Sequence, residues 1–412
     1  MHAVLISAIC LQRFGLAPSK GTAIFISLPV TIAGLSWLLI TNRARVSVPT
    51  LMGYLAFLLA VTVSAVLSLS NKDPQVLSIS LLAPVAIILN YTGLLLRPNF
   101  KFDRSCVFPI FVKYTRVSAV LGIVQYLAQF AGVRLFSLYL SFPALRPVLV
   151  EQNYNFDPIS EYGSSIRRAN GLFNIEPAIF SQLIVTAVCV EFFVLKRIRF
   201  LPVYAIAYIL SYSGTGALSL LLAMPFYIIL FPKESYRLSR LALIGVAVLG
   251  IGALLFPGEF TKLTSRSAEF SESGSSGYHR YVGQFEVVNS ILDNPRAIIG
   301  FGPGSFERST FSRQGTAGPV AKLITDYGVV GLLVFFSTLI SAIWRRDLAI
   351  IPLLMLSIFL FGGGNFAFSP FLMQMFLLCI WAAPPGYSRE PSRSGLVGSY
   401  HWRARGVELQ RR

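Results

Sequence analysis

The sequence predicts an all-α, polytopic integral membrane protein with about 11 or 12 transmembrane helices and two long loops on the outer side. Of its 412 residues, 54% are hydrophobic and only 13% are charged, about half the charged fraction of an average soluble protein. Apolar runs of about 20 residues recur, and each is long enough to span a bilayer. Backbone polar groups in lipid must be satisfied internally, and the runs lack the strict alternation of barrel strands, so helices are predicted.

Eleven apolar runs are the candidate spans, and they lie near residues 22–40, 50–70, 76–95, 107–130, 174–195, 198–212, 214–231, 240–257, 327–344, 348–363 and 366–383. Residues 1–18 form either a short first helix interrupted by Arg13 or a signal peptide. No Lys or Arg and no small-residue cleavage site precede Arg13, which favours the short helix. We therefore expect residues 1–383 to form a single transmembrane helical domain.

Basic residues follow alternate spans, and this pattern predicts the topology. Nineteen Lys and Arg residues fall on one side against five acidic ones, so this side is predicted to be cytoplasmic. It includes the tail 384–412, which is basic and is predicted to be disordered. A net charge of +17 is also typical of nucleic-acid binding, but this distribution is explained by orientation in an anionic membrane, so no nucleic-acid partner is predicted.

The opposite, outer side carries two long loops, 131–173 and 258–326. They are too long to be simple connectors, so function is expected to lie in them. All four cysteines lie outside these loops and the three histidines are scattered, so neither a disulfide nor a metal site is predicted.

The first motif of interest, "RRANGLFNIEP", precedes an apolar span. Pro177 suits a first helical turn, and Glu176 before it complements the helix dipole. The structural interpretation makes Glu176 a helix cap and lets Arg167 and Arg168 reach toward lipid phosphates. The functional interpretation makes the same residues an anion site at the membrane edge.

The second motif, "SYSGTGALS", begins another span with small residues. Ser213 and Thr215 either belong to a close helix-packing surface or form the polar floor of an anion pocket at a helix N-terminus.

The third motif, "GYHRYVGQFEVVNSILDNPRAIIGFGPGSF", covers residues 277–306. Its middle predicts an amphipathic helix over 284–292, with four apolar residues on one face: Phe285, Val288, Ile291 and Leu292. Gly302 and Gly304 indicate a tight reversal, because no Gly-Lys-Ser/Thr follows as in a phosphate-binding P-loop. His279 is a lone histidine, more often a surface residue than a catalytic one.

Together these motifs resemble the O-antigen polymerase and ligase family over residues 165–345. The matching residues are Arg168, Gly171, Phe173, Glu176 and Pro177, then Ser213, Gly214, Ala217 and Leu218, then Arg280, Asp293, Pro295, Gly300, Gly302, Gly304 and Phe306, and finally Asp326, Gly328 and Gly331.

The resemblance implies an integral-membrane glycosyltransferase that needs neither metal nor cofactor and acts at the periplasmic face of the bacterial inner membrane. Its donor and acceptor are oligosaccharides on undecaprenyl pyrophosphate, and its partners include a chain-length regulator and a flippase. Arg168 and Arg280 are then the catalytic residues that hold the diphosphate, because a guanidinium binds phosphate oxygens in pairs. Arg167, Ser213, Thr215, His279, Gly302 and Gly304 are the candidate substrate-binding residues.

The acceptor hydroxyl needs a base, and Glu176 is the preferred candidate. The other outer candidates are Glu286, Asp293, His279 and Asp326. Family ligases carry a histidine before the "DYGVVG" helix start, where this chain has Ala317–Pro319, which favours a polymerase over a ligase that transfers glycan to lipid A core.

A lipid-linked sugar flippase or secondary transporter is the alternative from another class. Three charged residues lie inside predicted spans: Lys113, Arg116 and Glu191. Lys113 and Arg116, one helical turn apart, would line its internal cavity or, in the structural interpretation, form a cationic face toward lipid head groups.

Overall fold

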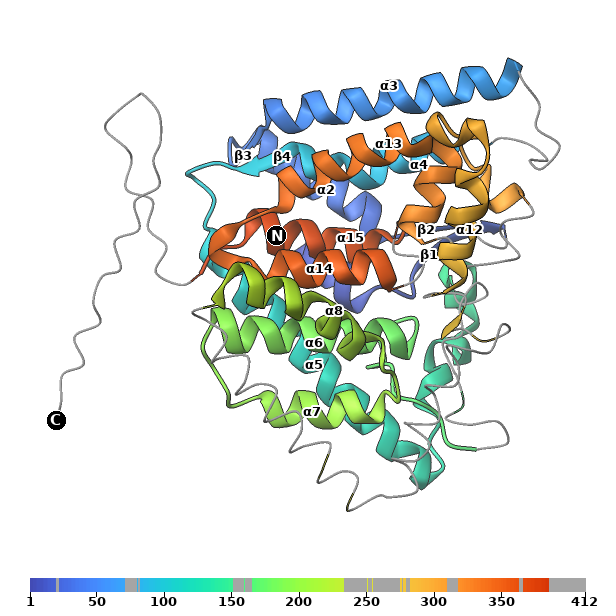
Figure 1. Ribbon diagram of the computed structural model, residues 1–412. Helices are drawn as coiled ribbons and strands as arrows, with labels where there is room; N and C mark the ends of the chain where they lie inside the picture. Colours follow the sequence, from blue (N-terminus) through green and yellow to red (C-terminus); the bar gives the residue numbers. More distant parts are fainter. Residues whose placement is uncertain are drawn as a thin grey trace.

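The computed structural model is a bundle of helices with almost no sheet (Figure 1). It describes residues 1–19, 22–70, 80, 82–150, 159, 165–232, 250, 254, 275, 277–278, 282–309, 318–362 and 366–384. Its main helices are α1 (His2–Cys10), α2 (Ser27–Ile40), α3 (Val48–Ser70), α4 (Leu82–Tyr91), α5 (Val107–Ala128), α6 (Pro177–Cys189), α7 (Leu201–Leu210), α8 (Thr215–Leu230), α12 (Gly283–Leu292), α13 (Pro319–Ile343), α14 (Ile350–Phe361) and α15 (Ser369–Phe376).

Helices coincide with ten of the eleven predicted spans, and the all-α membrane class is confirmed. Within the described residues, four helical stretches are long and apolar enough to cross a membrane: Val48–Ser70, Arg104–Ala131, Pro177–Val194 and Pro319–Ile343. Six shorter apolar helices accompany them. The predicted span at 240–257 lies outside the described residues, apart from two isolated positions.

Among the described residues, sheet consists of two small antiparallel pairs. β1 (Gly15–Ser19) pairs with β2 (Thr22–Phe25) just after α1, so the short first helix is confirmed and ends before Arg13. β3 (Ala44–Val46) pairs with β4 (Leu96–Pro98) at the other end of the bundle.

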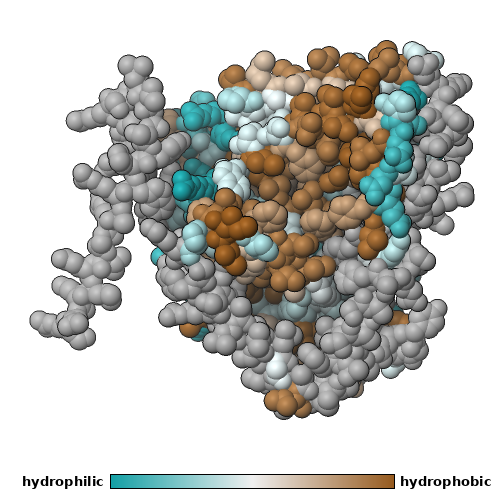
Figure 2. Space-filling view, in the orientation of Figure 1, coloured by the Kyte–Doolittle hydropathy of each residue, from teal (hydrophilic) through white to brown (hydrophobic). Residues whose placement is uncertain are grey.

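Hydrophilic side chains gather at the two ends of the helices, with a broad hydrophobic surface between them (Figure 2). At one end Arg45 faces Arg97 across the β3–β4 pair, and Arg104 donates to the backbone oxygens of Ile380 and Ala382. These arginines belong to the basic set from which the topology is predicted, and the fold brings them to a common end.

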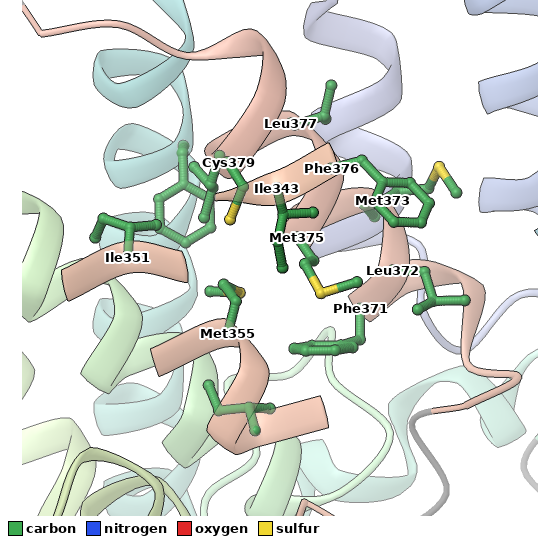
Figure 3. Close-up of a cluster of buried hydrophobic side chains, with 14 of the residues drawn as sticks. Ile343, Ile351, Met355, Phe371, Leu372, Met373, Met375, Phe376, Leu377 and Cys379 are labelled. Atoms are coloured by element: carbon green, nitrogen blue, oxygen red, sulfur yellow. The ribbon is translucent and has the colours of Figure 1, made fainter. Parts of the chain in front are cut away.

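α14 is largely buried, and α15, which continues as the π-helical turn η14 (Leu377–Trp381), is buried along its whole length. Figure 3 shows their Met, Leu and Phe side chains meeting at the centre of the bundle. Because lipid tails are as apolar as these side chains, close packing has to supply much of the stability here.

The first and last helices of the bundle touch. Gln374 on α15 donates from Nε2 to the backbone oxygen of Ala8 on α1 at 2.9 Å. Ser27, which opens α2, lies 3.0 Å from Ser369 between hydroxyl oxygens. Both contacts are buried, so α1 and α2 are joined to α15 inside the bundle.

α13 begins eight residues before the predicted start of its span. Pro319 opens the helix, and Gly328 then interrupts it with φ 71° and ψ −177°, a conformation essentially reserved for glycine. The stretch Pro319–Tyr327 is therefore a separate helical segment, which the prediction had placed in the outer loop.

Gly328→Ala is expected to lower the thermal transition of the detergent-solubilised protein by destabilising it by about 1–3 kcal/mol. A Cβ at Gly328 would overlap the backbone carbonyl of Ile298, in addition to the strain of the positive φ. Gly132→Ala is the matched control, because its φ is 78° but a Cβ meets nothing within 4 Å. Equal transition temperatures for the two variants would contradict this account.

The predicted amphipathic helix is confirmed as α12, and only part of its predicted apolar face is buried. The core-facing residues are Gln284, Val287 and Ile291. Phe285 and Leu292, predicted to share the apolar face with Ile291, are 52% and 50% exposed. The reason is that α12 packs on α13 along a face rotated away from them.

Candidate functional site

The segment before α6 is held by two glutamines spaced one helical turn apart, Gln125 on α5 and Gln129 directly after its last residue. Gln129 accepts the backbone N–H of Arg167 at 2.8 Å and donates to its carbonyl at 3.3 Å. Gln125 accepts the backbone N–H of Asn170 at 3.0 Å and donates to its side-chain oxygen at 2.9 Å. Each side-chain amide thus makes a pair of hydrogen bonds to a single residue, Gln129 to Arg167 and Gln125 to Asn170. Together the two pairs fix the path of the backbone around Arg168.

The turn that follows is equally constrained. Gly171 has φ 69°, its carbonyl accepts from Ser118, and a Cβ there would overlap Phe180. Asn174 donates to both the Ser118 hydroxyl and the Asn170 carbonyl. Only glycine fits this position, which accounts for the glycine of the first motif.

This turn delivers Glu176 to the N-terminus of α6. Glu176 is the N-cap residue, with an extended backbone, and Pro177 occupies the first helical position, as predicted. Arg167, Arg168 and Glu176 are all half-buried at this end of the bundle. A carboxylate therefore stands at a helix N-terminus, where negative charge is favoured, and the two arginines precede it on a backbone fixed by Gln125 and Gln129.

Arg13 is a site residue that sequence reasoning missed. It is fully buried, and it donates to the carbonyls of Phe136 at 3.1 Å and Asn174 at 3.4 Å. Its guanidinium also lies over the Tyr139 ring, 5.4 Å from the centroid. It joins the amino-terminal segment, the first long loop and the turn before α6. The available signal was an arginine within an otherwise apolar stretch.

The second motif is a packing surface between α6 and α8. Gly216 donates its N–H to Ser181 Oγ at 3.1 Å, and a Cβ at Gly216 would overlap the Ser181 carbonyl. The Ser213 hydroxyl lies 3.3 Å from those of both Ser181 and Thr215. These contacts fit the structural interpretation of Ser213 and Thr215; substrate binding by them stays a prediction.

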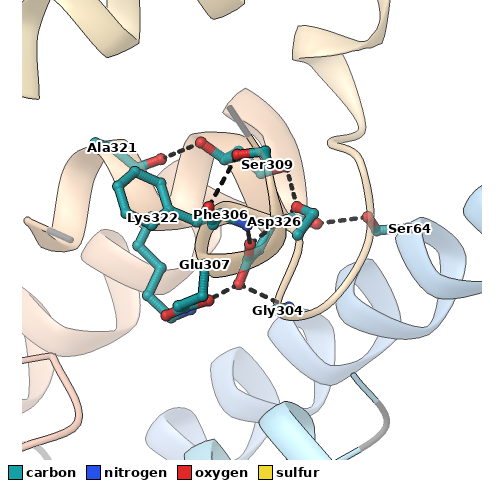
Figure 4. A network of polar contacts seen from close by, with 10 residues as sticks. Ser64, Gly304, Phe306, Glu307, Ser309, Ala321, Lys322 and Asp326 are labelled. Atoms are coloured by element: carbon teal, nitrogen blue, oxygen red, sulfur yellow. Dashed lines mark hydrogen bonds and ion pairs between the residues drawn. The ribbon is translucent and has the colours of Figure 1, made fainter. Parts of the chain in front are cut away.

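The third motif folds around one buried carboxylate, that of Asp326 on α13 (Figure 4). Asp326 accepts the N–H of Gly304 at 3.0 Å, the Ser305 hydroxyl at 3.0 Å and the N–H of Phe306 at 2.9 Å. Lys322 Nζ lies 3.0 Å from the same carboxylate. Gly300, Gly302 and Gly304 all have positive φ, which the reversal requires.

Asp326 is therefore a structural hub and a poor candidate for the base. Its four donors leave little lone-pair capacity for a substrate proton, and its side chain is completely buried. Its backbone carbonyl also accepts from Gly302 and from Ser64 on α3, which ties the loop to α13 and α3. Gly302 and Gly304 use their own N–H groups on Asp326, so their predicted contact with substrate remains untested.

The remaining predicted residues are distributed as follows. Arg280 and His279 lie outside the described residues. Glu286 is exposed and accepts a 2.5 Å hydrogen bond from the Tyr278 hydroxyl, which raises the pKa of Tyr278. Asp293 is exposed at the end of α12.

Two of the three charged residues predicted inside spans, Arg116 and Glu191, form an ion pair. Arg116 lies 2.7 Å from Glu191 and stacks over Phe200, 3.8 Å from the ring centroid. Lys113 is exposed on the surface of α5. Within the described residues, no group of three or more His, Cys, Asp or Glu side chains could hold a metal ion.

Gln125→Ala is expected to reduce both polymer formation and thermal stability, and more strongly than Gln129→Ala. Gln125 is fully buried, so its loss leaves Asn170 with unmade hydrogen bonds in the interior, at about 1–3 kcal/mol for each group. Gln129 is partly accessible to water, which replaces its bonds to Arg167. Melting curves and polymer yield measure the two effects. Equal melting temperatures and equal polymer yields for the two variants would contradict the larger role given to Gln125 in holding the segment before α6.

A family model matches residues 4–367, and its description is WcaD colanic acid polymerase. Comparison with curated proteins and with solved structures gives no match to either. The matched range contains α1 to α14 and every site residue discussed above, and it agrees with the resemblance to polysaccharide polymerases. The chain therefore belongs to the WcaD colanic acid polymerase family.

Proposed function

We propose that the chain is a membrane glycosyltransferase that polymerises oligosaccharide repeat units carried on undecaprenyl pyrophosphate, at the periplasmic face of the inner membrane. A hydroxyl of one lipid-linked unit attacks the anomeric carbon of another. The bond between that carbon and the pyrophosphate oxygen breaks, undecaprenyl pyrophosphate leaves, and a base takes the hydroxyl proton.

The observation that carries this proposal is the rigid turn around Arg168 at a helix N-terminus. Such a donor keeps its tail in the bilayer and its pyrophosphate at the interface, and a half-buried arginine whose flanking backbone is bound by Gln125 and Gln129 is suited to receive that pyrophosphate. Family membership supports a polysaccharide polymerase independently of this geometry.

In this proposal Arg168 and Arg280 bind the diphosphate and neutralise the charge that grows on the leaving group. Glu176, at the N-cap of α6, accepts the proton of the attacking hydroxyl. Arg167, Ser213, Thr215, His279, Gly302 and Gly304 bind the remainder of the substrate. Neither a metal nor a cofactor takes part.

Purified protein in proteoliposomes, supplied with undecaprenyl-pyrophosphate-linked repeat units alone, is expected to produce a ladder of longer lipid-linked glycans. Growth that requires added lipid A core would indicate a ligase instead. Movement of the units across the bilayer without any growth would indicate a flippase or transporter, and either result would overturn the proposal.

The side of the membrane has its own test. A reporter fused after Ser275 is expected to be active in the periplasm, and a reporter fused after Lys196 in the cytoplasm. The reverse pattern would separate the site from its proposed donor, whatever the outcome of the polymer assay.

A further inference from the structure

α12 has three distinct faces, although a helix packed on the surface of a water-soluble domain needs only two. The first face packs on the protein: Val287 and Ile291 join a small core with Phe301, Phe306 and Ile324. This face fixes the orientation of the helix, so the other two faces have defined directions.

The second face is apolar and exposed, and the third is polar and exposed. Phe285 and Leu292, seven residues apart, lie on one side with 52% and 50% exposure, and the exposed Asn289 borders them toward the polar side. Glu286, Ser290 and Asp293 lie on the other side and are also exposed. Separate apolar and polar faces are typical of a helix lying in the plane of a membrane interface.

The turn η10 (Pro295–Ile298) extends the apolar face and connects it to a membrane-spanning helix. Ile298 is 61% exposed, and Arg296 donates to the carbonyl of Leu67 on α3 at 3.2 Å. Near this contact α3 exposes Val66 and Leu69 by 56% and 64%. The apolar surface of α12 and η10 is thus continuous with the lipid-facing surface of α3.

The position of α12 in the fold agrees with this continuity. α12 lies at the end of the bundle where α13 begins, and it runs at a steep angle to α3 rather than alongside it (Figure 1). At this end the hydrophobic surface of the bundle gives way to a hydrophilic band (Figure 2), which is where lipid head groups meet water.

We propose that α12 and η10 form an interfacial element that rests in the lipid leaflet at this end of the bundle. Phe285, Leu292 and Ile298 enter the boundary between head groups and acyl chains, while the polar face of α12 stays in water. Arg296 lies at the depth of the lipid phosphates. Because η10 continues directly into the glycine loop around Asp326, contact with lipid sets the depth of that loop.

Single cysteines carrying an environment-sensitive fluorophore test this proposal in lipid nanodiscs, with the four native cysteines replaced. Phe285→Cys and Leu292→Cys are the lipid-facing positions, and Glu286→Cys and Ser290→Cys are matched controls on the same helix. The quenchers are iodide in water and nitroxides attached to the lipid head group or to the upper acyl chain.

Labels at positions 285 and 292 are expected to be quenched several-fold more by lipid nitroxides than labels at 286 and 290, and iodide is expected to show the opposite order. Equal iodide quenching at all four positions, or protection at 285 and 292 from both quenchers, would overturn the proposal. The second result would mean that protein covers this face.

Hydroxyl-radical footprinting of the unmodified chain provides a measurement that needs no variant. Phe285 and Leu292 are expected to be protected in nanodiscs, despite their exposure in the protein itself. Full modification at both residues would contradict membrane contact. Neither experiment depends on polymer formation, so the result stands apart from the proposed catalytic function.

Discussion

Arg168→Ala and Arg280→Ala are each expected to abolish polymer while lipid-linked single repeat units accumulate. Removing one group that stabilises developing charge typically costs about 10²–10³ in rate. Arg280→Lys is expected to be poor as well, since an ammonium cannot replace a planar fork that binds two phosphate oxygens. Gel analysis of the polymer and extraction of the lipid-linked intermediate measure both effects.

Arg167→Ala is the matched control for Arg168→Ala. Gln129 binds Arg167 through its backbone N–H and carbonyl, so the turn keeps its anchor when the side chain is removed, and a milder loss is expected. Arg43→Ala, an exposed position at the opposite end of the bundle, is expected to be near normal. Wild-type polymer from both Arg168→Ala and Arg280→Ala would refute the diphosphate-binding role.

Asp326→Asn is expected to give the largest loss of stability in the chain, on the order of 3–5 kcal/mol, because it leaves the buried Lys322 ammonium without its buried partner. The same change weakens the hydrogen bonds that hold Gly304 and Phe306. The expected result is a much lower melting temperature in detergent and little folded protein in the membrane.

Glu307→Gln is the matched control, because Glu307 also contacts Lys322 Nζ, at 2.5 Å, but its side chain is 51% exposed. Water replaces this contact, so a change of about 0–1 kcal/mol is expected. Adding Lys322→Met to Asp326→Asn removes the unpaired charge and is expected to recover part of the stability. A double variant no more stable than Asp326→Asn would show that the ion pair is not the cause.

Most of the fold could be predicted because membrane spans depend on local composition. A run of about 20 apolar residues is sufficient to predict a membrane-spanning helix, and the basic residues that follow alternate runs predict which helix ends lie on the same side of the membrane. The start of α13 could not be predicted this way. Pro319 begins a helix there, and Gly328 ends it with a sharp break where its backbone packs against the Ile298 carbonyl, a contact between segments distant in sequence.

In the candidate site too, features set by neighbouring residues were predictable from the sequence, and features set by distant residues were not. The sequence predicted the cap position of Glu176 from the Glu–Pro pair, and it predicted a tight reversal from the glycines. It did not predict that Asp326 would lie at the centre of that reversal, because the bond from Gly304 joins residues 22 positions apart. Arg13 was missed for the same reason, since its bond to the Asn174 carbonyl crosses 161 positions.

The contact between α1 and α15 has a consequence for how the protein is made. The hydrogen bond from Gln374 to Ala8 joins residues 366 positions apart, so α1 must wait until α15 has been synthesised before this contact can form. Arg13 waits likewise for residue 174. Contacts this distant in sequence form late, and intermediates that lack them expose unpaired surfaces. During synthesis the amino-terminal segment is therefore a natural client for insertion chaperones, and a nascent chain that stops before α15 leaves the α1 surface uncovered.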